Sequence, residues 1–215
     1  GCAVIEFPDT IDVDRMLSNL RQHPLVMYAE PSYLGITHSN KPCDYALEAQ
    51  WGLGNAYGHD IEAFPAWDLS AGDPDVLMTI LDTGISLDES TGELNHCDLK
   101  STRFIPGHDW AHDDPNSWVR DKFGHGTWVA GIAGAEAFNT DCYPPTTICG
   151  GVVGVAWQSK LFIVKVWGDD GHGNITGSPG TVHDGIIEAV QEKFPYPNQR
   201  MIINLSGGFF ETDTV

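Results

Sequence analysis

Three runs of apolar residues, each about as long as one strand, constrain the fold of this chain more than any other feature of its sequence. They are VLMTILD at 76–82, LFIVKVW at 161–167 and RMIINLS at 200–206. Between them lie segments with apolar residues at helical spacing, 126–137 and 181–194. Continuous apolar strands that alternate with helices are typical of a buried parallel sheet with helices on both faces. We therefore predict an α/β fold whose functional site lies at the carboxyl ends of the strands.

Composition and charge narrow the class of protein. With 41% hydrophobic residues, a chain of 215 residues can bury a substantial core. The 30 acidic residues against 11 basic ones give a formal charge of -19, which argues against a nucleic acid or an anionic membrane as a partner. No apolar run reaches the length of a transmembrane helix. Because the sequence begins at Gly1 within a predicted strand, we interpret it as a fragment that lacks its true start.

The first 41 residues are predicted to form a small unit of their own. Residues 2–7 and 25–35 have the composition of strands, and residues 13–22 have apolar residues at helical spacing behind Asp12, a candidate cap. The stretch from about Gly35 to Tyr45 has little apolar periodicity, so we interpret it as an exposed linker. The predicted organisation is a small α+β unit at 1–41 and a larger α/β domain at 42–215.

The cysteines give no evidence for a metal or redox motif. They are Cys2, Cys43, Cys97, Cys142 and Cys149, and no two of them form a C-x-x-C pair. Cys142 and Cys149 flank a loop rich in Pro and Thr, which a disulfide would close in an oxidising compartment. Free cysteines are the alternative.

Two polar residues stand at the ends of predicted elements. Asp82 ends the first apolar strand, so its carboxylate is expected at the carboxyl edge of the sheet rather than on a solvated face. His125 starts a predicted helix behind Gly124, and Gly126 and Gly131 allow the backbone to approach its neighbours closely. A helix N-terminus disfavours imidazolium, so a catalytic histidine there needs a carboxylate such as Asp82 to stabilise its charged form. The alternative is that both residues are structural caps.

Six segments, in chain order, carry a resemblance to one family: ILDTGI, NHCDL, GHGTWVAG, GGVVGVA, LFIVKVW and INLSGG. From about Gln50 to Ser206 the chain resembles the subtilisin-like serine proteases, the subtilases. The resemblance implies a serine endopeptidase with an Asp-His-Ser triad, made as a zymogen. It also implies that His125 is the general base and that Asp82 fixes its tautomer and stabilises the imidazolium.

The nucleophile of such a triad is not found in the sequence. In the family it lies in a G-T-S-M-A-like block, and no serine here follows Gly-Thr. Ser206 matches a substrate-binding block of the family instead, and Asn204 does not match the asparagine of the oxyanion hole. We therefore expect the domain to be cut before the nucleophile, the 215 residues alone to be inactive, and the complete protein to be an active peptidase.

Two segments, WGDDGHGNITG at 167–177 and INLSGG at 203–208, resemble the two edges of the substrate cleft of the family. Their glycines are expected to offer backbone groups to an extended peptide, and Trp167 and Ile175 are expected to line apolar subsites. The candidate substrate-binding residues are Trp167, Gly168, Gly171, Gly173, Ile175, Ser206, Gly207 and Gly208. The alternative for residues 167–177 is an ordinary glycine-rich turn after a strand.

One residue is a candidate metal ligand, although the chemistry itself requires no cofactor. Asp98 in NHCDL matches an aspartate that ligates a structural calcium in many subtilases, and a turn or cap role is the alternative. This sequence departs from the family pattern at Cys97, where proline is usual, and at Trp128, where many members have a second histidine. The acidic segment 108–121 lacks the ligand pattern of an EF-hand, so we interpret it as a solvated loop.

The N-terminal unit resembles the end of a subtilase propeptide, a small chaperone and inhibitor. This resemblance implies cleavage between about Gly35 and Asp44, and it implies secretion. The expected partners are a polypeptide substrate and the propeptide itself, and we expect a monomer.

Two other classes of protein stay open. One is an inactive relative of the subtilases that binds peptides in its cleft. The other is a metalloenzyme that uses His96, His108 and His112, the last two of which are four residues apart. The absence of an H-E-x-x-H block argues against the metalloenzyme.

Overall fold

The computed structural model describes residues 12–27, 29, 41, 42, 44, 46–55, 57–99, 103–114, 116, 118–138, 151–170, 172–192 and 200–209. The chain divides into two units, Gly1–His38 and Ser39–Val215. The first unit contains α1 (Val13–Arg21), which begins where the Arg15 N–H donates to the Asp12 carboxylate at 3.1 Å. The helix predicted behind the Asp12 cap is therefore present.

Of the two strands predicted in the first unit, the structure describes only residues 25–27 and 29. The chain turns directly after α1, where the Val26 N–H donates to the carbonyl of His23 at 3.0 Å, and residues 25–27 do not belong to a strand. The rest of the predicted strand at 25–35, except residue 29, and the predicted strand at 2–7 lie outside the described residues. The interpretation of this unit as a propeptide stays a prediction.

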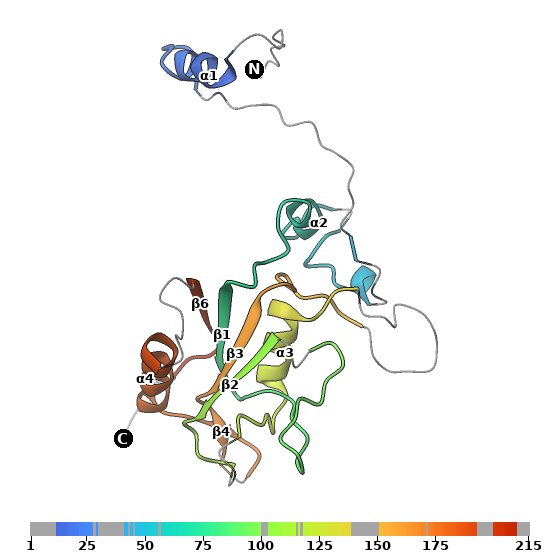
Figure 1. The fold of residues 1–215 in the computed structure, drawn as a ribbon, viewed down its shortest axis with the longest axis vertical. Coiled ribbons are helices and arrows are strands. Elements are labelled where there is room, and N and C mark those ends of the chain that lie inside the picture. The colour runs from blue at the N-terminus through green and yellow to red at the C-terminus, as the bar shows by residue number, and fades with distance from the viewer. Residues whose placement is uncertain are drawn as a thin grey trace. The chain divides into compact units, whose positions relative to one another are not determined.

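The second unit is built on a parallel sheet (Figure 1). Its strands are β1 (Val76–Asp82), β2 (Phe104–Asp109), β3 (Lys160–Lys165) and β6 (Arg200–Leu205), in the order β2-β3-β1-β6. The three predicted apolar runs are therefore the neighbouring strands β3, β1 and β6, all parallel. The sequence analysis did not predict β2, which lies at one edge and whose register shifts after Pro106. Edge strands tolerate proline because its missing N–H faces no partner.

The two faces of the sheet pack against different helices. Met78 and Ile80 of β1 cluster with Leu161 and Ile163 of β3 and with Ala130 of α3 (His125–Gly134). The alternate residues of the same strands face the other way, where they cluster with Val182 of α4 (Pro179–Ile187). Figure 1 shows these two helices on opposite sides of the strands. The prediction of a parallel sheet with helices on both faces is confirmed.

Local sequence explains where α4 begins. Ser178 and Thr181 form a capping box, in which each side chain binds the backbone N–H of the other, and Pro179 occupies the first helical position. The helix continues into a π-helical turn, η3 (Glu188–Glu192), which brings Glu188 into the core. None of the helices described in the structure has the length and apolar content to cross a bilayer.

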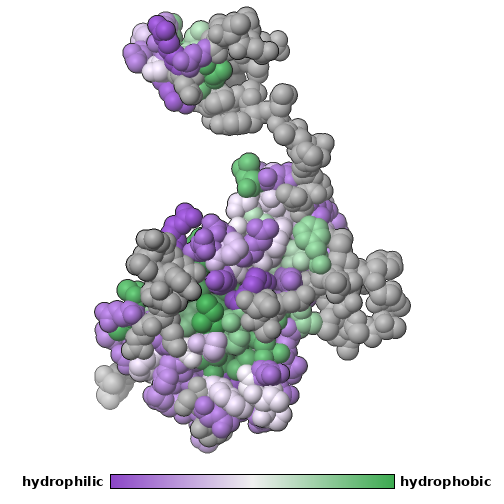
Figure 2. Space-filling view, in the orientation of Figure 1, coloured by the Kyte–Doolittle hydropathy of each residue, from purple (hydrophilic) through white to green (hydrophobic). Residues whose placement is uncertain are grey.

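Smaller elements complete the second unit. A 3-10 turn, η1 (Leu47–Ala49), and a short helix, α2 (Ala63–Trp67), share an apolar cluster with Val153 and Trp157. Two short strands, β4 (Gly168–Asp169) and β5 (Ile175–Thr176), form an antiparallel hairpin after β3. Figure 2 shows hydrophilic residues over much of the visible surface, with apolar residues gathered in the middle of this unit.

Candidate active site

Asp82 lies at the carboxyl end of β1, as predicted, and its side chain is completely buried. Its Oδ1 atom accepts a hydrogen bond of 2.7 Å from the N–H of Thr83, and lies 2.7 Å from Nδ1 of His125. Its Oδ2 atom is buried and has no hydrogen-bond partner among the described residues. A buried carboxylate that is not fully satisfied by N–H donors is well placed to stabilise a cation beside it.

His125 is the first residue of α3, and 42% of its side chain is exposed. Because Nδ1 faces the Asp82 carboxylate, the hydrogen bond between them places the proton of a neutral imidazole on Nδ1. The other ring nitrogen, Nε2, is then unprotonated. The arrangement gives a partly exposed base whose tautomer is fixed from the buried side.

Two glycines allow the start of α3 to lie this close to the end of β1. A Cβ atom on Gly126 would lie 2.3 Å from the carbonyl oxygen of Gly84, a distance that no side chain tolerates. Gly84 itself has a φ of 109°, in the region that only glycine adopts easily. The glycines of the T-G and G-H-G segments are therefore required for the contact between Asp82 and His125.

A residue that the sequence analysis did not identify, Asp121, holds the N-terminus of α3. Its carboxylate accepts hydrogen bonds from the N–H groups of Phe123, Gly124 and Thr127 and from the hydroxyls of Thr127 and Thr83, at 2.6–2.9 Å. The Thr83 hydroxyl in turn accepts from the Gly126 N–H at 2.8 Å. These contacts satisfy the first free N–H groups of the helix.

The charge of Asp121 is stabilised by these donors. Burial raises the pKa of Asp121, but the hydrogen bonds from Thr127, Gly124 and Phe123 outweigh it, so the pKa of this carboxyl lies below its ordinary value. The sequence carried a weak signal of this role, because an aspartate four residues before His125 lies just ahead of a predicted helix start.

The first predicted edge of the cleft is the hairpin of β4 and β5. Gly168 is buried in β4, while Ile175 in β5 is 44% exposed. Gly173 lies in the exposed turn with a φ of 84°, and Gly171 lies outside the described residues. The carboxylate of Asp170 accepts from the His172 and Asn174 N–H groups and so closes the turn.

The second predicted edge follows β6. Ser206 is partly buried, and its hydroxyl accepts a hydrogen bond of 2.8 Å from the side-chain amide of Asn204. Gly207 and Gly208 are exposed. A Cβ on Gly207 would lie 2.0 Å from the ring of Trp167, so this ring packs directly on the Gly207 backbone.

Trp167 thus brings the two predicted edges together. A Cβ on Gly177, at the end of the first edge, would also lie 2.0 Å from its ring. The side chain is 7% exposed and belongs to the apolar cluster on the α4 face. Trp167 is therefore placed as a buried support beneath the two segments, and a role for it in lining a subsite stays a prediction.

The contacts of Asp98 differ from those of a calcium ligand. Its carboxylate is buried and accepts from the N–H groups of Gly151 and Val152, at 3.2 and 3.4 Å. N–H donors repel a cation, and the described part of the chain contains no group of three or more acidic, histidine or cysteine side chains able to hold a metal. The described residues do not fit calcium, and we derive no step that uses it.

The acidic segment 108–121 is not the solvated loop that the sequence analysis expected. Asp109 is fully buried and accepts from the N–H groups of His112 and Asp114. Asp114 is also buried, and its carboxylate pairs with Arg120 at 2.9 Å. Burial raises the pKa of Asp114, but the hydrogen bonds from the Asn116 N–H and the Arg120 guanidinium outweigh this effect. The pKa of Asp114 therefore lies below its ordinary value. The interpretation was wrong because the carboxylates bind backbone N–H groups and buried cations rather than water.

In the described part of the chain, His96, His108 and His112 belong to no group of three or more histidine, cysteine or acidic side chains that could hold a metal. The rings of His108 and His112 pack edge to face with centroids 5.9 Å apart, and His108 also packs against Trp110. The nearby Glu188 carboxylate accepts from the His108 N–H and from the indole of Trp110. Its Oε2 atom therefore satisfies two partly buried donors.

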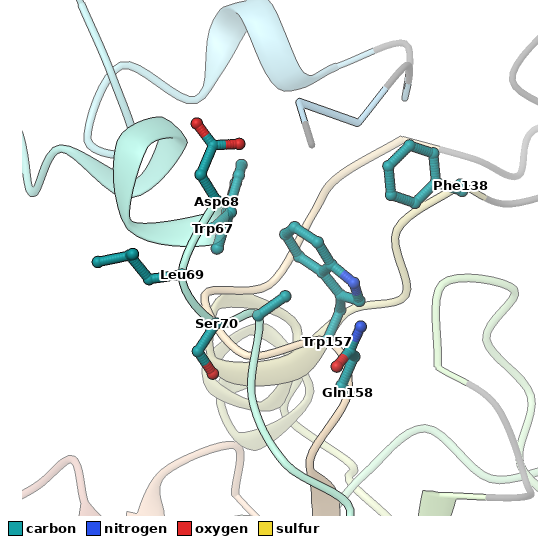
Figure 3. Close-up of a pocket in the computed structure, with 8 residues that line it drawn as sticks. Trp67, Asp68, Leu69, Ser70, Phe138, Trp157 and Gln158 are labelled. Carbon is teal, nitrogen blue, oxygen red and sulfur yellow. The ribbon is translucent and has the colours of Figure 1, made fainter. Parts of the chain in front are cut away.

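Two further features lie apart from this site. A small pocket is lined by residues of α2 and of the turn before β3, with the ring of Phe138 at its rim (Figure 3), and it includes none of the predicted site residues. Cys97 is a free thiol. Cys142 and Cys149 lie outside the described residues, so their disulfide stays a prediction.

Comparisons with known proteins match this sequence to one family. The sequence model of the subtilase family, Peptidase_S8, matches residues 73–214. A thermophilic serine proteinase of Bacillus sp. (strain AK1) is 29% identical over 197 residues, which cover 92% of this chain and 41% of the relative. The major intracellular serine protease of Bacillus subtilis (strain 168) is 32% identical over 135 residues, which cover 62% of this chain and 36% of the relative.

Among solved structures, the Clostridium perfringens CspB protease aligns with a TM-score of 0.46 and 23% identity, covering 71% of this chain and 32% of that chain. The present chain spans about two fifths or less of the length of these proteins.

Proposed function

The chain belongs to the subtilase family, and from this premise we propose that it is part of a serine endopeptidase in which Asp82 and His125 are two members of an Asp-His-Ser triad. The observation that carries the proposal is the 2.7 Å contact between the buried Asp82 Oδ1 and Nδ1 of the partly exposed His125. Both compared relatives from Bacillus are also named as serine proteases.

In the proposed reaction, Nε2 of His125 takes the hydroxyl proton of the serine as its oxygen attacks the peptide carbonyl. The imidazolium that forms donates through Nδ1 to Asp82, whose burial in the sheet strengthens the attraction between the two charges. His125 then gives the proton from Nε2 to the leaving amine, and water completes hydrolysis by the reverse sequence. Asp82 keeps its negative charge throughout.

We propose that the nucleophile lies in a G-T-S-like block, which these 215 residues do not contain. We propose that the side chain that donates to the oxyanion also lies outside these 215 residues. The 215 residues alone are then expected to bind peptides without hydrolysing them. The complete gene product is the protein in which activity has to be measured.

The test compares histidine variants of the complete gene product. His125→Ala is expected to lower kcat for a peptide substrate by at least about 10³-fold, because general base catalysis is lost. His183→Ala is a matched control, since His183 Nδ1 also lies 3.0 Å from an aspartate oxygen, that of Asp184, but in an exposed pair. Hydrolysis that persists in His125→Ala refutes the proposal.

Inhibitor experiments separate the proposed mechanism from the alternatives. A serine-directed inhibitor should abolish hydrolysis, and zinc chelation should leave it unchanged. Loss of activity on chelation alone would favour a metalloenzyme. Peptide binding with no hydrolysis by the complete protein would favour an inactive relative.

We also propose that the protein is made as a zymogen and secreted. The resemblance of the first 41 residues to a propeptide supports this proposal. Two of the compared relatives are named as intracellular or thermophilic enzymes without reference to secretion, so location needs its own test. A mature protein with its N-terminus between residues 35 and 44 is expected in the culture medium. Recovery of only uncleaved protein from the cytoplasm would contradict this proposal.

A further inference from the structure

A buried ion pair lies at the carboxyl edge of the sheet, beside the candidate catalytic residues. Lys165, the last residue of β3, is aligned with Asp82 in the parallel register of β1 and β3. Its side chain is 1% exposed, and its ammonium contacts the carboxylate of Asp113 and donates to the carbonyl of Arg120 at 2.7 Å. A buried ammonium is costly unless it is paired, so Asp113 is required by Lys165.

The carboxylate of Asp113 also binds the first predicted edge of the cleft. Its Oδ2 atom accepts a hydrogen bond of 2.8 Å from the N–H of Asp169, in β4. The preceding residue packs closely on the same group, because a Cβ on Gly168 would lie 3.0 Å from Asp113 Cγ. One carboxylate therefore ties the end of β3 to the hairpin that follows it.

The same pair reaches the segment that leads to His125. The carbonyl of Arg120, which accepts from Lys165, precedes Asp121, the residue that holds the start of α3. Lys122 lies on the other side of Asp121, donates to the carbonyl of Asp113 and has its ammonium 3.8 Å from Asp113 Oδ2. The network of Asp113, Lys165 and Lys122 thus contacts the β4–β5 hairpin. It also includes groups of the residues on either side of Asp121, which holds the start of α3.

We infer that Asp113 and Lys165 are positioning residues, which hold the β4–β5 hairpin in place relative to His125 so that a bound peptide strand presents its scissile bond to the base. The inference rests on the proposed function and adds to it a determinant of binding for extended peptides. Neither residue touches the reacting atoms. Their effect should therefore grow with the length of peptide that pairs with the β4–β5 hairpin, and be small for a substrate that does not reach this hairpin.

The test uses the complete gene product and two substrates, an extended peptide amide and the ester of a single amino acid. The double variant Asp113→Leu/Lys165→Met removes both charges, so that neither is left buried alone, but it also removes the acceptor of the Asp169 N–H. KM for the extended peptide is expected to rise about tenfold, with kcat and the ester kinetics changed less than about threefold.

Two further variants separate positioning from loss of stability. Arg103→Met is the matched control, because Arg103 is a half-buried cation that donates to the carbonyls of Ser159, just before β3, and of Gly134, the last residue of α3. Both carbonyls lie at the opposite ends of these elements from Lys165 and His125. It should lower stability without changing the ratio of KM values for the two substrates. Lys122→Met changes a more exposed member of the network, so it provides a folded variant if the double variant does not fold, and should raise KM for the peptide about threefold.

Peptide affinity is also measured in a His125→Ala background, where no hydrolysis is needed. The double variant there should weaken binding of the extended peptide about tenfold. An unchanged affinity and an unchanged KM ratio in the folded variants would overturn the inference, as would a failure of the His125→Ala parent to bind the peptide. If peptides bind to the edge but the complete protein does not cleave them, the proposed function fails and the inference stands.

Discussion

Replacing Asp121 by Asn is expected to destabilise the start of α3 and to slow catalysis, although Asp121 does not touch His125. The carboxylate accepts five hydrogen bonds, three on Oδ1 and two on Oδ2. In the Asn variant one oxygen keeps the three contacts of Oδ1. The amide NH₂ takes the place of Oδ2, where it faces the N–H of Thr127, and two donors cannot bond to each other.

The magnitude follows from these contacts. The N–H of Thr127, a buried residue, loses its acceptor, which costs about 1–3 kcal/mol, and the remaining bonds lose the contribution of a charged acceptor. Water reaches part of the site and offsets some of this loss. We expect the free energy of unfolding to fall by about 2–4 kcal/mol, and kcat to fall about 10- to 100-fold as His125 becomes less well placed.

Urea unfolding of the complete protein measures the change in stability, with His125→Ala in both parent and variant to prevent self-digestion. The matched control is Asp88→Asn. The Asp88 carboxylate also accepts four hydrogen bonds from a short turn, but all fall on Oδ1, which an Asn can keep. Its hydrogen bonds lower the pKa of Asp88 to about 2, but the site is exposed to water, so the change should be much smaller than that of Asp121→Asn.

The effect of Asp121 also has a defined dependence on pH. The pKa of Asp121 is lowered in the folded protein from an ordinary value of 3.8, so the folded state binds fewer protons than the unfolded state. The contribution of the Asp121 charge to the free energy of unfolding is present above about pH 4, and it is lost as the pH falls through the pKa of Asp121 in the folded protein. The stability difference between parent and Asp121→Asn should therefore shrink below about pH 4. A difference under about 0.5 kcal/mol at pH 7, or one that grows in acid, would show that the charge of Asp121 does not stabilise the start of α3.

Three other substitutions test separate parts of the account. Gly126→Ala places a Cβ against the carbonyl of Gly84, so kcat should fall about 100-fold, and an unchanged kcat would show that the close approach is not needed. Ile175→Glu puts a charge on the exposed edge of the hairpin and should raise KM for peptides with apolar residues before the scissile bond about tenfold, with little change for peptides that have basic ones. Asp98→Asn should lower the melting temperature equally with calcium and with a chelator, because Asp98 binds the backbone of residues 151–152; stabilisation by calcium that is lost only in the variant would instead identify a ligand.

The sheet and the Asp82–His125 contact could be predicted because their signals are local and strong. An apolar run of strand length is typical of a buried strand in a parallel sheet, and the carboxyl ends of such strands meet at one edge of the sheet. Asp82 and His125 each stand at such a boundary. β2 was missed because FIPGHD carries a proline and a glycine, and only its position at the edge of the described sheet allows these residues in a strand.

The burial of the acidic segment could not be predicted, because it depends on partners far away in sequence. The charges of Asp113 and Asp114 predict solvent exposure on composition alone. Their burial requires Lys165 of β3 and Arg120, which only the folded chain brings into contact with them. In the same way, the apolar side chain of Trp167 led to the prediction that it lines a subsite. Its packing on Gly177 and Gly207 depends on the three-dimensional fold.

The most direct test of the central claim is the kcat of the Asp82→Asn variant of the complete gene product, measured against pH. An Asn amide can donate to Nδ1, which would leave the proton of His125 on Nε2 and remove the base. The proposed triad predicts a fall in kcat of about 10³–10⁴-fold at neutral pH, with the protein still folded. A folded Asp82→Asn variant whose kcat and pH profile match those of the parent would contradict it.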